Sequence, residues 1–155
     1  MQTDKFKLVD EINLLAIDYG TKNVGLAMFC CGKDTIPSAY QTLDFESNKR
    51  LIVELIRIVK REEIAIVVLG VPLLLDGQET SMTKKVLEFS RSLKKELSKY
   101  NVELALQDET LSSFEAKDRM KNSPLFNFKV NEKKIDELAA AIILESFLKK
   151  NPPCK

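Results

Sequence analysis

Three acidic residues stand at positions where a carboxylate is unusual. Asp18 ends an apolar segment, and Glu109 closes the last expected strand, beside Asp108. Asp136 falls on the same face of an expected helix as Ala139 and Ala140, with which it shares helical spacing. A carboxylate on an apolar face is costly to bury unless a partner neutralises it. These residues are therefore our candidates for chemistry.

Strand ends are where ligands of open α/β sheets gather, so Asp18 and Glu109 are expected at one sheet edge, with Asp136 brought over it. Three converging carboxylates repel one another unless cations neutralise them. Oxygen ligands alone suit Mg²⁺ or Mn²⁺. Two such ions about 4 Å apart activate water and stabilise the leaving oxygen in phosphodiester hydrolysis. The pattern thus predicts a metal-dependent nuclease with catalytic and metal-binding residues Asp18, Glu109 and Asp136.

Each residue also has an ordinary structural interpretation. Asp18 would serve as a turn residue or cap, and Glu109 with Asp108 as a solvated strand exit. Asp136 would pair with Lys133. The functional hypothesis depends on their combination with the order of elements, and on no residue alone.

Composition narrows the alternatives. The chain has 155 residues, 45% of them hydrophobic and 30% charged, which fits one globular domain over 1–155. It has no histidine, which excludes His-based zinc sites and Ser-His-Asp triads. Net charge is +1, so any nucleic-acid signal must be local. Three cysteines without framework spacing, and no signal peptide or membrane span, lead us to expect a cytoplasmic protein.

Apolar periodicity and turn residues predict five strands and four helices. The expected strands cover 14–18, 24–31, 36–43, 64–69 and 102–106. The expected helices cover 47–62, 80–100, about 112–120 and 131–149, with caps at Ser47, at Ser112 or Ser113, and at Asn131. The segment 64–69 is apolar throughout, as in a central parallel strand, and Gly70 should stop it in a turn that shapes the site floor.

The resulting order is β-β-β-α-β-α-β-α-α. Three meandering strands followed by α/β crossovers predict an α/β fold with a five-stranded mixed sheet flanked by helices.

Four motifs together resemble the YqgF family, also called RuvX, over about residues 12–149. This is a Holliday junction resolvase family with an RNase H-like fold. Each motif alone has low specificity, but the four occur in the order and at the spacing found in the family. They are Asp18-Tyr-Gly-Thr-Lys-Asn-Val-Gly-Leu-Ala, Leu69-Gly-Val-Pro-Leu, Asp108-Glu-Thr-Leu-Ser-Ser and Lys134-Ile-Asp-Glu-Leu-Ala-Ala-Ala-Ile-Ile-Leu.

The resemblance implies a divalent-metal nuclease that acts on DNA junctions or in maturation of the small-subunit (pre-16S) ribosomal RNA 5′ end. Asp18, Glu109 and Asp136 match the family's acidic positions. Two positions depart from the family, because Asn23 and Thr110 stand where it usually has arginines, the natural ligands of phosphate. These departures put substrate affinity in question but not the metal site, and Lys22 offers a partial substitute.

Further candidates for nucleic-acid binding surround the loop before the last helix. Phe126 and Phe128 are interleaved with lysines there and are expected to stack on unpaired bases, unless they anchor the loop to the core. The basic residues of this region are Lys117, Arg119, Lys121, Lys129, Lys133 and Lys134. A second basic run is interpreted as the solvated face of its helix: Lys84, Lys85, Arg91, Lys94, Lys95 and Lys99.

The expected partner is structured RNA or DNA, and no membrane, for a monomer or homodimer. Symmetric junction cleavage needs two sites related by a two-fold axis, and no dimer seam is evident in the sequence. RNA processing is therefore favoured over junction resolution. Two rival functions stay open: an actin-like ATPase, which needs a second domain and would show ATP-dependent stabilisation, and a non-catalytic RNA-binding assembly factor, against which the intact acidic triad argues.

Overall fold

The computed structural model describes residues 6–109, 112–127, 129–131 and 134–153, with backbone only at 112 and 113. The element order confirms the prediction, with one short 3₁₀ helix added. The strands are β1 (Asn13–Asp18), β2 (Asn23–Cys30), β3 (Ser38–Asp44), β4 (Ile64–Val71) and β5 (Glu103–Asp108). The helices are α1 (Asn48–Arg61), α2 (Ser81–Ser98), α3 (Ser112–Lys121), η1 (Pro124–Phe126) and α4 (Ile135–Lys150).

The five strands form one mixed sheet in the order β3-β2-β1-β4-β5. Strands β1, β2 and β3 make an antiparallel meander, while β4 pairs in parallel with both β1 and β5. Consequently β1, β4 and β5 all end at the same edge of the sheet. We call this edge the carboxyl edge.

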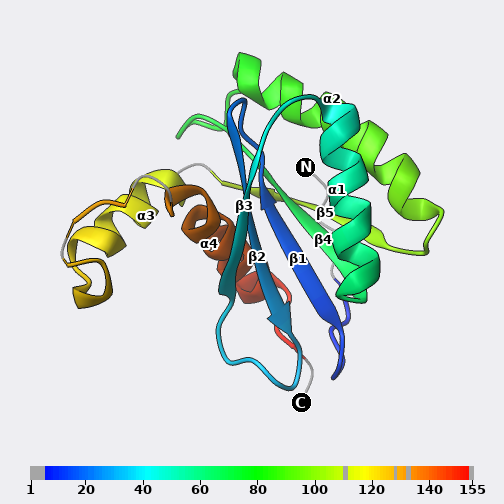
Figure 1. Cartoon of the computed structure of the whole chain (residues 1–155), viewed down its shortest axis with the longest axis horizontal. Coiled ribbons are helices and arrows are strands. Elements are labelled where there is room, and N and C mark those ends of the chain that lie inside the picture. The colour runs from blue at the N-terminus through cyan, green and yellow to red at the C-terminus, as the bar shows by residue number, and fades with distance from the viewer. Residues whose placement is uncertain (1–5, 110–111, 128, 132–133, 154–155) are drawn as a thin grey trace.

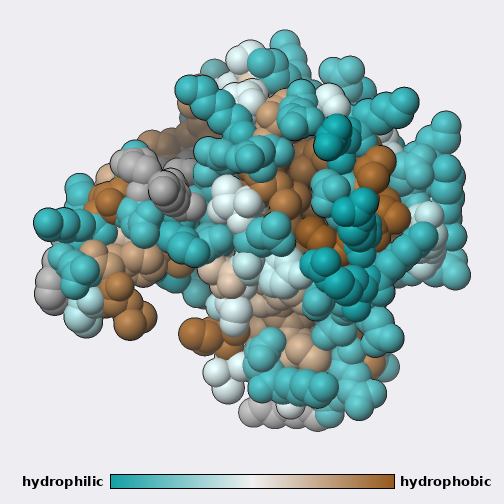
Figure 2. All heavy atoms as spheres, viewed as in Figure 1, coloured by the Kyte–Doolittle hydropathy of each residue, from teal (hydrophilic) through white to brown (hydrophobic). Residues whose placement is uncertain are grey.

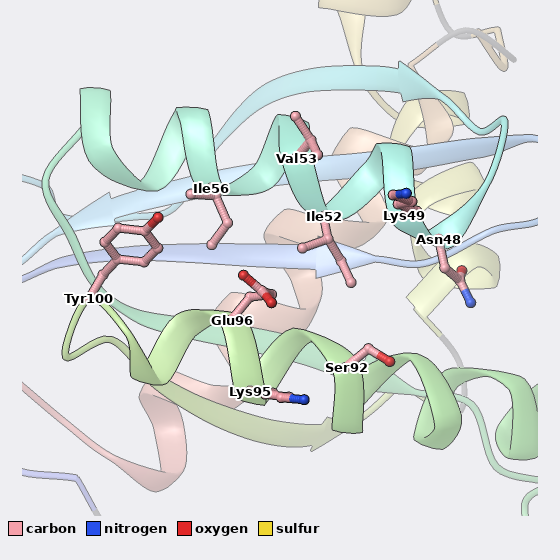
Figure 3. Close-up of a pocket in the computed structure, with 9 residues that line it drawn as sticks. All are labelled: Asn48, Lys49, Ile52, Val53, Ile56, Ser92, Lys95, Glu96 and Tyr100. Carbon is pink, nitrogen blue, oxygen red and sulfur yellow. The ribbon is translucent and has the colours of Figure 1, made fainter.

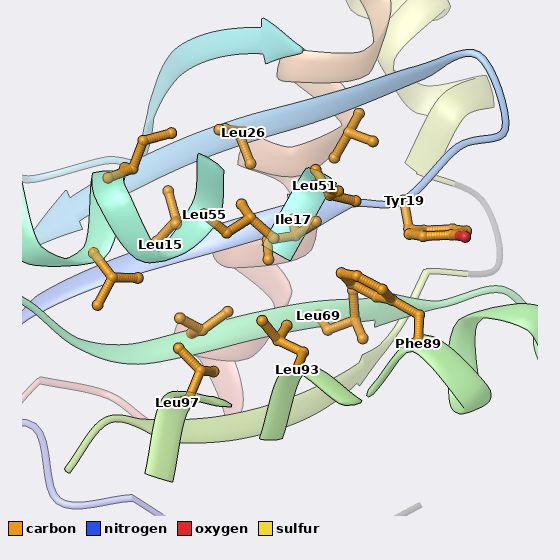
Figure 4. Packing of buried hydrophobic residues seen from close by; sticks show 14 of the residues in the cluster. Leu15, Ile17, Tyr19, Leu26, Leu51, Leu55, Leu69, Phe89, Leu93 and Leu97 are labelled. Atoms are coloured by element: carbon orange, nitrogen blue, oxygen red, sulfur yellow. The ribbon is translucent and has the colours of Figure 1, made fainter. Parts of the chain in front are cut away.

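Helices cover both faces of the sheet (Figure 1). Alternation along each strand sends one set of side chains toward α1 and α2 and the other set toward α4. The larger apolar cluster lies under α1 and α2, and Figure 4 shows strand residues such as Ile17 and Leu69 meeting Leu55, Phe89 and Leu93 from the two helices. The second cluster lies under α4 and includes the other strand set.

Helix α3 packs mainly on α4, to the left in Figure 1. A third apolar cluster joins the two helices, with Met120 from α3 and Ile142 from α4 among its buried members. Helix α4 is therefore buried on nearly all sides, which explains why its apolar residues show no single stripe. Among the described residues, no helix is long and apolar enough to cross a membrane.

The observed helix starts can be compared with the predicted N-cap residues. Ser47 accepts a hydrogen bond from the Arg50 backbone N–H, as predicted, and Thr80 forms a capping box with Thr83 at the start of α2. The cap expected at Asn131 is wrong, because α4 begins at Ile135 and its N-cap is Lys134, which makes no side-chain cap bond. The side chains of the two serines expected to cap α3 lie outside the described residues.

The strand ends also differ from expectation at one important place. Gly70 does not stop β4, which continues to Val71. Parallel pairing with β5 carries the strand on, with Gly70 opposite Gln107 and Val71 opposite Asp108. Gly70 therefore belongs to the sheet surface and not to a turn. β3 is an edge strand and begins at Ser38, after Pro37, two residues later than the predicted start.

Candidate active site

Strand alternation decides which side chains reach the carboxyl edge on the α4 side. Leu14 and Ala16 of β1 belong to the cluster under α4, so Asp18, two residues on, faces the same side. The same parity applies in the neighbouring strands β2 and β4, because Gly25 lies two residues before Ala27 of that cluster and Gly70 lies two residues after Val68. A carboxylate thus ends one strand between two strands that carry glycine.

Asp18 is buried, with a side chain that hydrogen-bonds the side chain of Glu109. Burial raises the pKa of Asp18 to about 6; the hydrogen bond with Glu109 lowers this pKa in part, and the negative charge of Asp136 raises it. A hydrogen bond between two carboxyl groups requires a proton on one of them. Asp18 and Glu109 therefore form a pair that a proton or a cation must neutralise.

Glu109 follows β5 directly, and its backbone N–H donates to the carbonyl oxygen of Val71 at 3.1 Å. Its carboxyl carbon lies 3.0 Å from the place that a Cβ on Gly70 would occupy. On the same side, that Cβ would collide with the side chain of Ile143 from α4. Gly70 thus leaves the space that the Glu109 carboxyl fills, although the expected turn at this glycine is wrong.

Asp136 lies in the first turn of α4, where the helix crosses β2. The Asp136 carbonyl oxygen occupies the space that a Cβ on Gly25 would need. Gly25 is in turn the strand partner of Asp18. Asp136 is therefore one strand away from Asp18 and half-buried, close enough for its charge to act on the pKa of Asp18.

The start of α4 adds a favourable field to this edge. The N-terminal turn of a helix presents unpaired N–H groups and a partial positive charge. Asp136 and Glu137 both stand in this turn. The position suits acidic side chains and any anionic ligand beside them.

Glu137 is a buried acidic residue of the site region that the sequence hypothesis did not include. Its carboxylate accepts a hydrogen bond from the Thr42 hydroxyl at 3.3 Å and pairs with Lys134 at 3.1 Å. Thr42 lies on β3 opposite Gly25. Glu137 thus ties the first turn of α4 to the edge strand, and the signal available in the sequence was its place directly after Asp136.

The donor set of the site consists of carboxylate oxygens, which fits a hard divalent cation. Asp18 and Glu109 would supply two ligands from a pair that already needs neutralising. Within the described ranges, no three His, Cys, Asp or Glu side chains are grouped closely enough to hold one ion. The observed arrangement is therefore a two-carboxylate site with Asp136 as its third candidate ligand.

The residues expected to bind nucleic acid differ in their surroundings. Lys22 in the β1–β2 turn and Asn23 at the start of β2 are exposed at the carboxyl edge, as a substrate contact requires. Lys134 is also exposed, but its ammonium group pairs with Glu137. Three further candidates lie outside the described residues: Thr110, Phe128 and Lys133.

The surroundings of Phe126 favour the alternative that it anchors its loop to the core. It is half-buried and packs against the cluster between α3 and α4. Arg119 is likewise held within the protein, since its guanidinium contacts Glu145 at 2.7 Å and Glu115 at 2.9 Å. These carboxylates raise the pKa of Arg119 further. Both residues fasten α3 to α4.

Exposed apolar residues lie on the segments that leave β4 and β5, a feature that sequence reasoning missed. Leu75 is 81% exposed in the loop after β4, and Phe114 is 72% exposed on α3. A bridge between Leu73 and Glu79 and the left-handed Gly77 fold this loop into a tight hairpin. Periodicity gave no signal here because neither residue belongs to a regular apolar stripe.

A family model described as "RuvX: Holliday junction resolvase" matches residues 12–150. A protein of Maridesulfovibrio salexigens named "Putative pre-16S rRNA nuclease" is 36% identical over 138 residues, covering 88% of this chain and 98% of its own. Proteins of the same name from Crocosphaera subtropica and Haemophilus ducreyi are 32% and 30% identical, covering 90% of this chain and 94% and 97% of theirs.

Solved structures show the same fold at low sequence identity. Thermus thermophilus RuvC bound to a Holliday junction substrate aligns with a TM-score of 0.59 and 11% identity, over 89% of this chain and 95% of that one. The fowlpox virus Holliday junction resolvase aligns with a TM-score of 0.55 and 15% identity, over 89% and 98% of the two chains. At this identity the likeness establishes the fold, and the expected RNase H-like architecture is confirmed.

Proposed function

The chain belongs to the RuvX family and is a nuclease, and we propose that it hydrolyses phosphodiester bonds in 5′-end processing of the small-subunit ribosomal RNA precursor, using a divalent metal. The observation that carries the chemistry is the buried Asp18–Glu109 carboxyl pair at the carboxyl edge. The RNA substrate is supported by the names of relatives that this chain covers almost from end to end.

Asp18 and Glu109 would hold the metal, with Asp136 as the further candidate. Bound there, Mg²⁺ or Mn²⁺, as one ion or a pair, supplies activation of water and charge stabilisation for phosphodiester hydrolysis. Burial of Asp18 strengthens its interaction with any cation, because the surroundings of a buried group screen charge weakly. A cation bound there would take the place of a proton in neutralising the pair.

Other residues of the edge would position the substrate. Lys22, exposed in the β1–β2 turn, offers a point charge to a phosphate, and Asn23 beside it offers amide donors in place of a guanidinium. The first turn of α4 directs its N–H groups to the same edge. Binding through these groups is weaker and less directional than binding by two arginines, and with fewer cationic contacts the affinity should depend less steeply on salt.

The substrate is tested by cleavage of two matched probes, a fragment spanning the 5′ end of precursor small-subunit RNA and a four-way DNA junction. We expect metal-dependent cleavage of the RNA by the wild-type protein and none by Asp18→Asn. Symmetric cutting of the junction with no RNA cleavage would overturn the RNA assignment and keep the nuclease. Tight RNA binding without cleavage of either probe in Mg²⁺ or Mn²⁺ would make the protein a non-catalytic assembly factor.

A further inference from the structure

A groove runs between the outer faces of α1 and α2, on the side of the sheet opposite α4. Its volume is about 720 Å³. Figure 3 shows Ile52, Val53 and Ile56 lining it from α1, and Tyr100, which follows α2, at one end. Val53 and Tyr100 are 54% and 41% exposed. In the space-filling view, apolar atoms reach the surface between these two helices and polar residues surround them (Figure 2).

The two helices that form the groove carry a strong positive charge. Together α1 and α2 contain ten Lys and Arg residues and three Glu residues, a net charge of +7 in a chain whose total is +1. Lys49 and Lys95 line the groove itself. In the part of the chain that the structure describes, neither lysine has a carboxylate within ion-pair distance, whereas Arg50 and Arg57 of α1 and Lys99, the C-cap residue of α2, do.

This charge limits what can cover the apolar strip. A second copy of the same face would bring two positively charged pairs of helices together, which is unfavourable. A nucleic-acid backbone would satisfy the lysines but leave the aliphatic floor of Ile52, Val53 and Ile56 without a partner. A protein segment with apolar and acidic side chains satisfies both the floor and the rim.

We propose that this groove binds an acidic amphipathic helix of a partner protein. The floor from Asn48 to Ile56 extends about 12 Å, or two helical turns, at 1.5 Å per residue. That length accepts apolar side chains at i, i+4 and i+7 of a bound helix, the spacing of helix-in-groove recognition. Glutamates on either side of that stripe would reach Lys49 and Lys95.

The groove is separate from the carboxylate site but connected to it. The Tyr19 hydroxyl donates a 2.6 Å hydrogen bond to Asn48 Oδ1 at the groove's end. Tyr19 directly follows Asp18 and faces the opposite side of the sheet. A partner bound in the groove would thus be placed beside the catalytic edge, and the proposal does not depend on the nuclease assignment.

The test uses the full chain and a fluorescent synthetic helical peptide with leucines at i, i+4 and i+7 and glutamates on both flanks. The control peptide keeps the glutamates and replaces the leucines with serines. Fluorescence anisotropy should show binding of the first peptide only. Lys95→Glu and Val53→Asp should each weaken binding about tenfold or more, while leaving thermal unfolding and cleavage unchanged.

Lys94→Glu provides the matched control, because it makes the same charge change one residue away, on a side of α2 that lines a different hollow. Its binding should stay close to wild type. An equal loss of peptide binding in Lys94→Glu and Lys95→Glu would mean that diffuse electrostatic attraction holds the peptide, and would overturn the groove as its binding site. Preferential binding of a single-stranded RNA at this face, or dimerisation through it in sedimentation, would overturn the proposed partner.

Discussion

The carbonyl of Asp136 fills the space above Gly25, so that α4 and β2 meet backbone to backbone at the strand position paired with Asp18. This contact fixes the distance between α4, which carries the candidate ligand Asp136, and β2, which is the neighbour of the strand that carries Asp18. A side chain at residue 25 would meet main-chain atoms, which cannot rotate away.

Gly25→Ala should therefore displace the start of α4. We expect the free energy of unfolding to fall by about 3 kcal/mol, at the upper end of overpacking costs, and cleavage to be lost in the protein that still folds. Urea unfolding and a cleavage assay measure the two effects. Gly77→Ala is the matched control: its φ of 84° makes the change strained, but a Cβ there meets nothing within 4 Å. It should lose about 1 kcal/mol and keep its activity.

Asp18→Asn should change how stability depends on pH in the absence of metal. A folded-state pKa of about 6 against an ordinary value of 3.8 means that folded Asp18 holds its proton more tightly than unfolded Asp18. Its contribution to stability is complete below about pH 3.8 and is lost as pH rises through 6. Above pH 6 the ionised group costs roughly 3 kcal/mol, which asparagine avoids.

The measurement is thermal unfolding of the wild type and Asp18→Asn in chelator between pH 4 and pH 7.5. The variant should gain melting temperature over the wild type as pH rises, and the gain should shrink toward acid pH. A constant difference across the range would show that burial of the charge plays no part.

Glu137 should act as a positioning residue for the first turn of α4. Glu137→Ala removes the acceptor of the Thr42 hydrogen bond, whereas Glu137→Gln keeps an acceptor oxygen and loses only the charge that pairs with the exposed Lys134 ammonium group. We expect kcat to fall in Glu137→Ala with little change in KM, and to recover in Glu137→Gln. Equal kcat in all three proteins would remove Glu137 from the site.

Phe126→Ala should destabilise the α3–α4 contact. Phe126 packs on the cluster that joins these helices, so truncation should cost about 1–3 kcal/mol, less than for a fully buried ring. Leu125→Ala is the control, because Leu125 is 90% exposed and its loss should leave stability unchanged. If Phe126→Ala weakens RNA binding at unchanged stability, the stacking role expected from the sequence applies after all.

The sequence predicted the fold well because its signals are local. Strand alternation and helical periodicity define each element, and alternation alone places Asp18 and Glu109 on one side of the carboxyl edge. The sequence prediction was wrong where contacts between segments far apart in the chain decide the local structure. Gly70 stays in β4 because β5 pairs with it, and Phe126 is covered by helices whose contact no local pattern reveals.

Glu137 shows the same limit within the site. Its hydrogen-bond partner Thr42 is 95 positions away along the chain, so no spacing rule could connect them. Asp136, in contrast, was identifiable because a carboxylate among Ala139 and Ala140 contradicts the apolar helix around it. Buried polar residues are detectable from sequence where they interrupt a pattern, and not where their partner alone explains them.

The central claim is that Asp18 and Glu109 jointly hold the divalent ion on which cleavage depends. Calorimetric titration of Mn²⁺, with a cleavage assay on the same samples, compares the wild type, Asp18→Asn, Glu109→Gln and the control Asp44→Asn at the exposed end of β3. We predict that the first two variants lose Mn²⁺ binding and at least ~10²-fold in cleavage rate, since the ion supplies several kcal/mol, while the control keeps both. Cleavage by Asp18→Asn at the wild-type rate, or activity retained in chelator, would contradict the account.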